Sequence, residues 1–142
     1  MKKENILGGR RFGRTIVLSA LYQYEVSKVP LEKLVKLEWV DYDLTDDLKE
    51  FIIDLISGTI NNIEKIDELI EKYSTNWSLN RISPVDKAIL RFSIYSLLFR
   101  KDIPPSVAID EAIEISKKYS TEKSYKFING ILDGIRKNEI KD

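Results

Sequence analysis

Three arginines lie close together near the N-terminus, at Arg10, Arg11 and Arg14. Arg10 and Arg14 are four residues apart, which places them on one face of a helix with Arg11 beside them. Guanidinium groups present planar forks of N–H donors that suit phosphate oxygens and base edges. The cluster is therefore a candidate nucleic-acid contact. A solvated basic helix end, partly paired with acidic residues elsewhere in the chain, explains it equally well, because short basic clusters are common.

Four lysines form a second basic group around Ser120. They are Lys117, Lys118, Lys123 and Lys126. Lys117 and Lys118 fall in the last turn of an expected helix, where positive charge is favourable without any ligand. The group is a candidate binding surface whose first half also has a purely structural explanation.

Two aromatic residues complete the candidate contacts. Tyr22 follows the expected core position Leu21, and Phe127 lies one position off the apolar stripe of its helix. Exposed aromatic rings near basic side chains provide the stacking platforms that single-stranded RNA needs. Both positions are also compatible with core or boundary packing.

The chain has no cysteine and no histidine. Disulfides, thiolate zinc sites and cysteine nucleophiles are thereby excluded, and the commonest general base is missing. The carboxylate groups Asp46/Asp47 and Asp110/Glu111/Glu114 resemble helix caps and solvated faces more than acid–base machinery. We predict a protein that is not an enzyme, with no catalytic residues, no metal site and no cofactor.

The charge distribution is uneven although 23 basic and 23 acidic residues give a net charge of zero. Residues 1–28 carry six Lys/Arg against two Glu, residues 29–80 five against twelve acidic residues, and residues 81–142 twelve against nine. Two basic ends therefore flank an acidic middle, and a local basic surface can exist within a neutral total.

Helical periodicity of the apolar residues predicts the elements that would position these side chains. The expected helices span about 10–27, a short stretch from Leu31, 45–73, 84–99, 107–119 and 122–137. Ser83 and Pro84 are typical of a helix start, and Asp86 is placed to complete a capping box. The helix after them is apolar almost all round, which is typical of a central, buried helix.

No convincing strand is visible, and Asp41-Tyr42-Asp43 is expected to form a connecting loop. We predict an all-α fold of about seven helices in two packed subdomains, residues 1–76 and 77–142. No apolar run has the length of a membrane span or of a signal peptide, so a cytoplasmic protein with no membrane partner is expected.

Several motifs resemble the NusB family of transcription antitermination factors. Arg10-Arg11-x-x-Arg14 followed by Leu18-x-x-Leu21-Tyr22 is similar to the family's opening, as is Leu55-x-x-Gly58 in the long helix. The later matches are Val85-Asp86-Lys87-Ala88-Ile89-Leu90-Arg91, Tyr95, Ile103-Pro104, Val107-Ala108-Ile109-x-Glu111-Ala112 and Lys126-Phe127-Ile128-Asn129-Gly130-Ile131-Leu132-Asp133. They occur in the family's order and spacing, and the resemblance covers roughly residues 10–137. Gly13 replaces the family's usual alanine and Asp86 its common glutamate, which weakens the carry-over of a partner contact at Asp86.

The resemblance implies an all-α protein of two helical subdomains that pairs with NusE, a small-subunit ribosomal protein. Together they would bind boxA-type single-stranded RNA and help the RNA polymerase antitermination complex read through terminators, including those of ribosomal RNA operons. Carried over by position, the RNA surface would comprise Arg10, Arg11, Arg14, Tyr22, Lys126 and Phe127, with Arg91 and Lys123 as weaker candidates.

Two other functions remain open from the sequence. The chain could be a detached NusB-like RNA-binding domain of an RNA cytosine methyltransferase, although it lacks the catalytic cysteine and the cofactor-binding α/β domain of such an enzyme. A helical protein-interaction adaptor without RNA affinity is the third interpretation.

Overall fold

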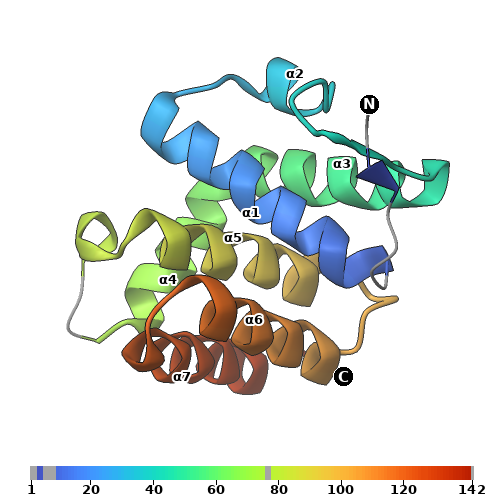
Figure 1. The fold of residues 1–142 in the computed structure, drawn as a ribbon. Coiled ribbons are helices and arrows are strands. Elements are labelled where there is room, and N and C mark those ends of the chain that lie inside the picture. The colour runs from blue at the N-terminus through green and yellow to red at the C-terminus, as the bar shows by residue number, and fades with distance from the viewer. Residues whose placement is uncertain (1–2, 5–8, 76–77, 142) are drawn as a thin grey trace. The chain divides into compact units, whose positions relative to one another are not determined.

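The computed structural model describes residues 3–4, 9–75 and 78–141 and is all-α in class, as predicted (Figure 1). Its α-helices are α1 Gly9–Ser27, α2 Leu31–Leu34, α3 Asp46–Asn61, α4 Ile63–Tyr73, α5 Pro84–Phe99, α6 Pro105–Tyr119 and α7 Glu122–Glu139. A short 3₁₀ helix, η1 Leu79–Arg81, precedes α5. None of the helices in the described ranges combines the length and hydrophobicity that a membrane crossing requires.

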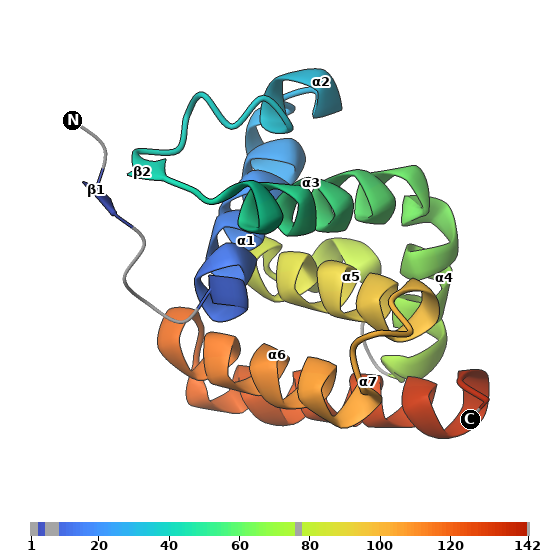
Figure 2. The same cartoon turned by 90° about the vertical axis from the view of Figure 1, so that its right-hand side faces the viewer.

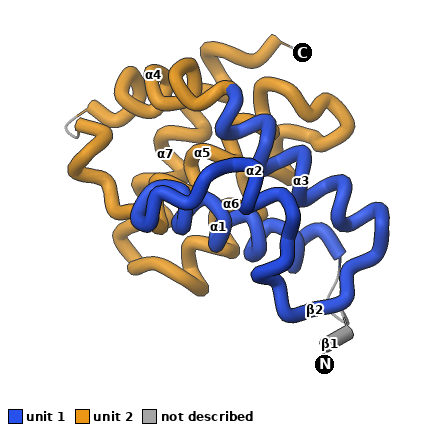
Figure 3. Tube along the Cα trace, turned by 90° about the horizontal axis from the view of Figure 1, so that it is seen from above, with its two compact units in different colours: residues 1–61 blue, residues 62–142 orange. Residues whose placement is uncertain are grey.

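The chain divides into two compact units, residues 1–61 and 62–142 (Figure 3). The sequence-based boundary at residues 76 and 77 falls on residues outside the described part of the chain. The division in the structure lies earlier, so α4 belongs to the second unit and not to the first.

The division coincides with a break in the helix that the sequence predicts over residues 45–73. Asn62 leaves the helical region, with φ −116° and ψ 21°, and separates α3 from α4. The apolar spacing continues on both sides of Asn62, so periodicity alone predicts one helix where two are present. The prediction of one continuous helix over residues 45–73 was wrong in this respect.

In the first unit, α1 packs against α3 through apolar faces that both elements bury. Gly13 is the point of close approach. A Cβ atom there would lie 2.9 Å from Leu48 Cδ1 and 3.3 Å from both Ile52 Cγ1 and Phe51 Cδ2. The missing side chain therefore lets α3 come close to the first turns of α1.

A pair of two-residue strands joins the segment before α1 to the loop before α3. β1 Lys3–Glu4 pairs in parallel with β2 Tyr42–Asp43 (Figure 2), and the Tyr42 ring meets Phe12 edge-on with centroids 4.8 Å apart. The expected loop at residues 41–43 thus contains a strand. Strands this short carry no periodicity, and their pairing is non-local, so the sequence gives no signal for them.

In the second unit, α4, α6 and α7 all pack on α5, and α6 and α7 lie side by side (Figures 1 and 2). The side chains of α5 are buried from Asp86 to Leu97, which confirms the expected central helix. Ser83 caps it as predicted, because its hydroxyl accepts a hydrogen bond from the Asp86 N–H at 3.2 Å and Pro84 occupies the first turn.

The end of α7 is anchored to α4 through Glu139. Its Oε2 atom accepts hydrogen bonds from Tyr73 OH at 2.6 Å and Lys72 Nζ at 2.9 Å. These bonds, that of Tyr73 first, lower the pKa of the Glu139 carboxyl, and the carboxylate in turn raises the pKa values of Tyr73 and Lys72. Gly134 lies under the ring of Tyr73, where a Cβ atom would be 2.9 Å from Cδ1.

The two glycines of α7 provide a matched test of this packing. We expect Gly130→Ala to raise the free energy of unfolding by up to about 1 kcal/mol, because alanine favours helix and its Cβ would meet open space. Gly134→Ala should instead lower it by about 1 kcal/mol, because the Tyr73 ring is held by Glu139 and cannot move away cheaply. Urea denaturation of both variants measures the difference, and equal gains from the two substitutions would contradict the α4–α7 packing.

Candidate nucleic-acid interface

The structure separates the three N-terminal arginines into exposed and buried members. Arg10 and Arg11 are exposed, whereas Arg14 is only 4% exposed. All three belong to the first turns of α1, with Arg14 turned toward α3. The predicted cluster therefore presents two guanidiniums to solvent and keeps the third inside the unit.

A single aromatic ring lies beneath two of these arginines. The guanidinium carbon of Arg10 is 4.6 Å from the centroid of the Phe51 ring, and that of Arg14 is 5.3 Å from the same centroid. Both distances fall within the range of cation–π attraction. Phe51 comes from α3 and is 4% exposed, so the contact joins the basic end of α1 to the core of the unit.

Tyr22 is one of the exposed aromatic residues, at 40%. It follows Arg11 by eleven residues in the same helix, so the two side chains point in nearly the same direction, about 16 Å apart along the axis. One face of α1 therefore carries a cation and an aromatic ring that are both accessible to solvent.

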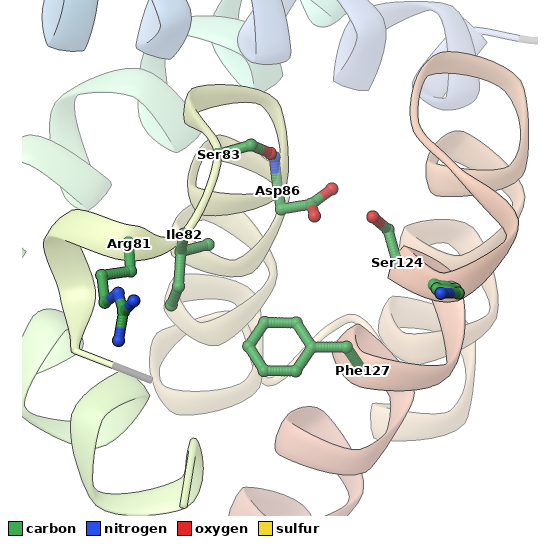
Figure 4. Close-up of a pocket in the computed structure, with 7 residues that line it drawn as sticks. Arg81, Ile82, Ser83, Asp86, Ser124 and Phe127 are labelled. Atoms are coloured by element: carbon green, nitrogen blue, oxygen red, sulfur yellow. The ribbon is translucent and has the colours of Figure 1, made fainter. Parts of the chain in front are cut away.

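The second unit contains a pocket of about 450 Å³ between the start of α5 and the start of α7 (Figure 4). It is lined by Arg81, Ile82, Ser83, Asp86, Lys123, Ser124 and Phe127. Arg81 and Ile82 come from the segment just before α5, and the ring of Phe127 extends from α7 toward them (Figure 4). The volume of the pocket falls in the range of about 300–1,000 Å³ that is usual for ligand sites.

Two short hydrogen-bonded links hold the walls of this pocket in place. Asp86 Oδ1 accepts a hydrogen bond from Ser120 Oγ at 2.6 Å, which ties the first turn of α5 to the joint between α6 and α7. Thr121 caps α7 by accepting a bond from the Ser124 N–H at 3.3 Å. The predicted capping-box role of Asp86 is thus replaced by a tertiary contact that bridges two helix starts.

Two of the three predicted residues of α7, Lys123 and Phe127, line this pocket, and Lys126 is not part of its lining. Lys123 and Lys126 are exposed, and Phe127 is half-buried. Lys123 and Phe127 line the pocket together, four residues apart on α7. On α6, Lys117 Nζ lies 3.8 Å from Glu114 Oε1 and over the ring of Tyr125. These contacts support a structural role for Lys117.

Arg91, the weaker RNA candidate on α5, is buried and paired within the second unit. Its side chain is 6% exposed and forms a fork with Asp67 of α4, with Nε–Oδ1 and Nη2–Oδ2 distances both 2.9 Å. A buried guanidinium needs such a partner, because an unpaired charge would be very costly there. Arg91 therefore has a structural role that joins α4 to α5, and an RNA contact at Arg91 stays a prediction.

Sequence reasoning did not find Arg81, Ile82, Ser83 or Ser124 as members of a site. Arg81 and Ile82 belong to η1 and its end, where no apolar period exists to place them. The sequence could nevertheless have indicated these two residues, because Arg81 and Ile82 directly precede the predicted N-cap Ser83 and so lie at the N-terminal end of α5. Within the described residues, no group of three or more acidic side chains is arranged to hold a metal ion.

A comparison with models of known protein families identifies the family of this chain. The model of the NusB family matches residues 12–137, nearly the whole length. The chain belongs to the NusB family.

Individual NusB relatives are similar over most of their own length. The transcription antitermination protein NusB of Acetivibrio thermocellus is 46% identical over 129 residues, which cover 91% of this chain and 89% of that protein. The corresponding protein of Treponema denticola is 42% identical, with 90% and 96% covered.

Solved NusB structures share the fold. T. maritima NusB superposes with a TM-score of 0.87 at 45% identity, covering 99% of this chain and 96% of that one. A chain from the crystal structure of antitermination factors NusB and NusE in complex with dsRNA matches with a TM-score of 0.82 at 28% identity, covering 93% and 98%. The NusB fold therefore extends over both units.

The structural role of Arg91 in this NusB chain can be tested against Arg100. We expect Arg91→Met to lower the free energy of unfolding by about 3 kcal/mol, because Asp67 would lose its partner while only 19% of its side chain is exposed. Arg100→Met should cost less than about 1 kcal/mol, because the fork of Arg100 with Asp102 leaves half of that carboxylate in water.

Denaturant unfolding and RNA titration of the folded variants measure both effects. Adding Asp67→Leu to Arg91→Met should restore most of the stability, since no unpaired charge then remains. A loss of RNA affinity with unchanged stability in Arg91→Met would return Arg91 to the binding surface.

Proposed function

We propose that this NusB-family protein is a transcription antitermination factor that binds boxA-type single-stranded RNA together with NusE. In the antitermination complex it would promote RNA polymerase readthrough, including that of ribosomal RNA operons. The observation that carries the proposal is the match, over 93% of the chain, to the NusB of a structure that contains NusE and dsRNA.

The chemistry of the exposed side chains supports an RNA ligand. Arg10 and Arg11 on α1, and Lys123 and Lys126 on α7, offer N–H donors to phosphates, and each unit adds an aromatic ring within reach of solvent. We assign the RNA contacts to Arg10, Arg11, Tyr22, Lys123, Lys126 and Phe127. Arg14 is buried in the first unit, where its guanidinium packs on the Phe51 ring, and it is not assigned an RNA contact. Binding is the whole task in this proposal, and the RNA is left chemically unchanged.

The aromatic residues favour single-stranded over double-stranded RNA. A ring can stack only on a base that is not already stacked within a helix, and paired RNA displays mainly phosphates and 2′-hydroxyls. Tyr22 is 40% exposed and Phe127 lines a pocket, which supports contacts of these rings with unstacked bases. Duplex RNA would use the cations but not these rings.

NusE is the partner that the charge distribution suits. Residues 29–80 carry seven more acidic than basic residues, and Asp46, Asp47 and Glu50 at the start of α3 are exposed. An acidic surface attracts a basic protein, as a ribosomal protein generally is, and opposite charges favour fast and specific association. The chain can thus offer cations to RNA and carboxylates to its protein partner.

The decisive experiment measures RNA and NusE binding in the same titrations. We expect a boxA-type single strand to bind more tightly when NusE is present, and NusE to bind more tightly by the same factor when RNA is present, because coupling free energies are reciprocal. Duplex RNA of the same sequence is the control and should bind more weakly. Each measurement should state the salt concentration, since phosphate contacts make the affinity salt-dependent.

The other functions predict different results. A detached NusB-like domain of a methyltransferase would bind RNA without any effect of NusE. A protein-interaction adaptor would show no RNA binding at any salt concentration. Either result would contradict the proposal.

Phe127 separates the stacking role from a packing role. If its ring stacks on a base, we expect Phe127→Ala to weaken RNA binding by about 1–3 kcal/mol. Because the ring is only half-buried, the loss of folding stability should stay below the roughly 3–5 kcal/mol of a fully buried phenylalanine. RNA titration and the denaturant midpoint of one variant give both numbers.

Tyr125 is the matched control for Phe127, as another half-buried aromatic residue of α7. Tyr125→Ala should leave RNA affinity unchanged in the folded protein, and Phe127→Tyr should retain it because the ring remains. A large loss of stability in Phe127→Ala with intact RNA affinity would end the stacking assignment.

A further inference from the structure

We infer that Phe51 is a positioning residue for RNA binding, because its buried ring holds the exposed guanidinium of Arg10 at the surface of the first unit. The inference rests on the proposed function, since it concerns how one of the proposed RNA contacts is placed. Phe51 itself touches no RNA in this arrangement and acts through Arg10.

Three observations place Phe51 in this role. Its ring is 4% exposed, so the helix core of α3 holds it in one position. The guanidinium carbon of Arg10 lies 4.6 Å from the ring centroid, whereas Arg10 as a residue remains exposed. Arg14 lies at 5.3 Å from the same centroid and is buried, so the ring is shared between an inner and an outer cation.

The contact leaves Arg10 able to bind a phosphate. Attraction between a cation and a ring uses the face of the ring, while the N–H donors of a guanidinium lie in its own plane and can point away from that face. One arginine can therefore rest on an aromatic ring and still offer a fork of donors to an anion. An arginine without such a support would have to be ordered when the ligand binds, which weakens binding.

Gly13 allows the core residue Phe51 to approach the side chain of Arg10 at the surface. A Cβ atom at this position would meet Leu48, Ile52 and Phe51 at 2.9–3.3 Å. Without a side chain at Gly13, α3 approaches the first turns of α1 closely enough for Phe51 to lie under Arg10. Gly13 thus contributes to the same contact.

A double-mutant cycle tests whether Phe51 acts through Arg10. Phe51→Leu keeps an apolar side chain in the core but removes the ring, and it should weaken binding of a boxA-type single strand about two- to fivefold, as expected for one cation–π contact at a partly exposed site. In an Arg10→Gln background the same substitution should have no further effect. In an Arg11→Gln background, where Arg10 and its contact with Phe51 are retained, the two- to fivefold loss should persist.

Each arm of the cycle has a distinct meaning. A Phe51→Leu loss of equal size in the Arg10→Gln background would show that the ring supports only the fold, and would overturn the inference. Arg10→Gln alone should weaken binding and lower the log–log salt slope by about 0.7 for the lost phosphate contact. An unchanged slope and affinity would leave the ring with no contact to position, and would overturn the inference while wild-type RNA binding stands. Absence of RNA binding by the wild type would instead overturn the proposed function.

A second measurement needs no variant that might unfold. In NMR spectra of the free wild-type protein, the side-chain protons of Arg10 should be shifted upfield by the Phe51 ring and should give a resolved Nε–Hε signal. Random-coil shifts for the Arg10 side chain in the wild type would overturn the inference.

Discussion

The burial of α5 is the constraint on which the second unit depends. Its side chains are buried from Asp86 to Leu97, so apolar surface must reach it from several directions, and α4, α6 and α7 supply it. Each of these helices gains stability in proportion to the apolar area that it removes from water, at about 25 cal/mol per Å². Because α5 has no solvated side along this stretch, a charged side chain on it needs a partner within the protein.

Two polar residues of α5 show how those partners link the core to the candidate site. Arg91 is satisfied by Asp67, and this fork fixes α4 on α5. Asp86 is satisfied by Ser120, and this bond brings the α6–α7 joint to the start of α5. Phe127 and Lys123 therefore reach the pocket because a buried carboxylate at the first turn of α5 requires a donor. The position of the candidate site therefore depends on the hydrogen bond that the buried Asp86 carboxylate accepts from Ser120.

How much the sequence could predict depends on whether a residue's signal is local. The helix start at Ser83 could be predicted, because a cap and the apolar period lie within one turn of each other. The break at Asn62 and the pairing of β1 with β2 could not be, since neither interrupts an apolar pattern nearby. The burial of Arg14 and the pairing of Arg91 with Asp67 could not be predicted, because each depends on residues distant in the sequence, which periodicity does not reveal. Arg10, Arg11, Lys123 and Lys126 were predicted candidates that the structure places in solvent.

In the proposed function, short-range contacts would supply most of the RNA affinity, because a protein with no net charge attracts RNA at long range only through its local basic surfaces. The few exposed cations of each unit would give only a weak complex if all of them were ordered during binding. Contacts that are ordered before binding raise affinity without additional charge. In the proposed function, the Phe51 ring under Arg10 and the Ser120–Asp86 hydrogen bond beside the Phe127 pocket would provide such order. Weak, pre-organised contacts of this kind leave room for a protein partner to complete the binding energy. A factor built in this way would hold RNA firmly only where that partner is also present.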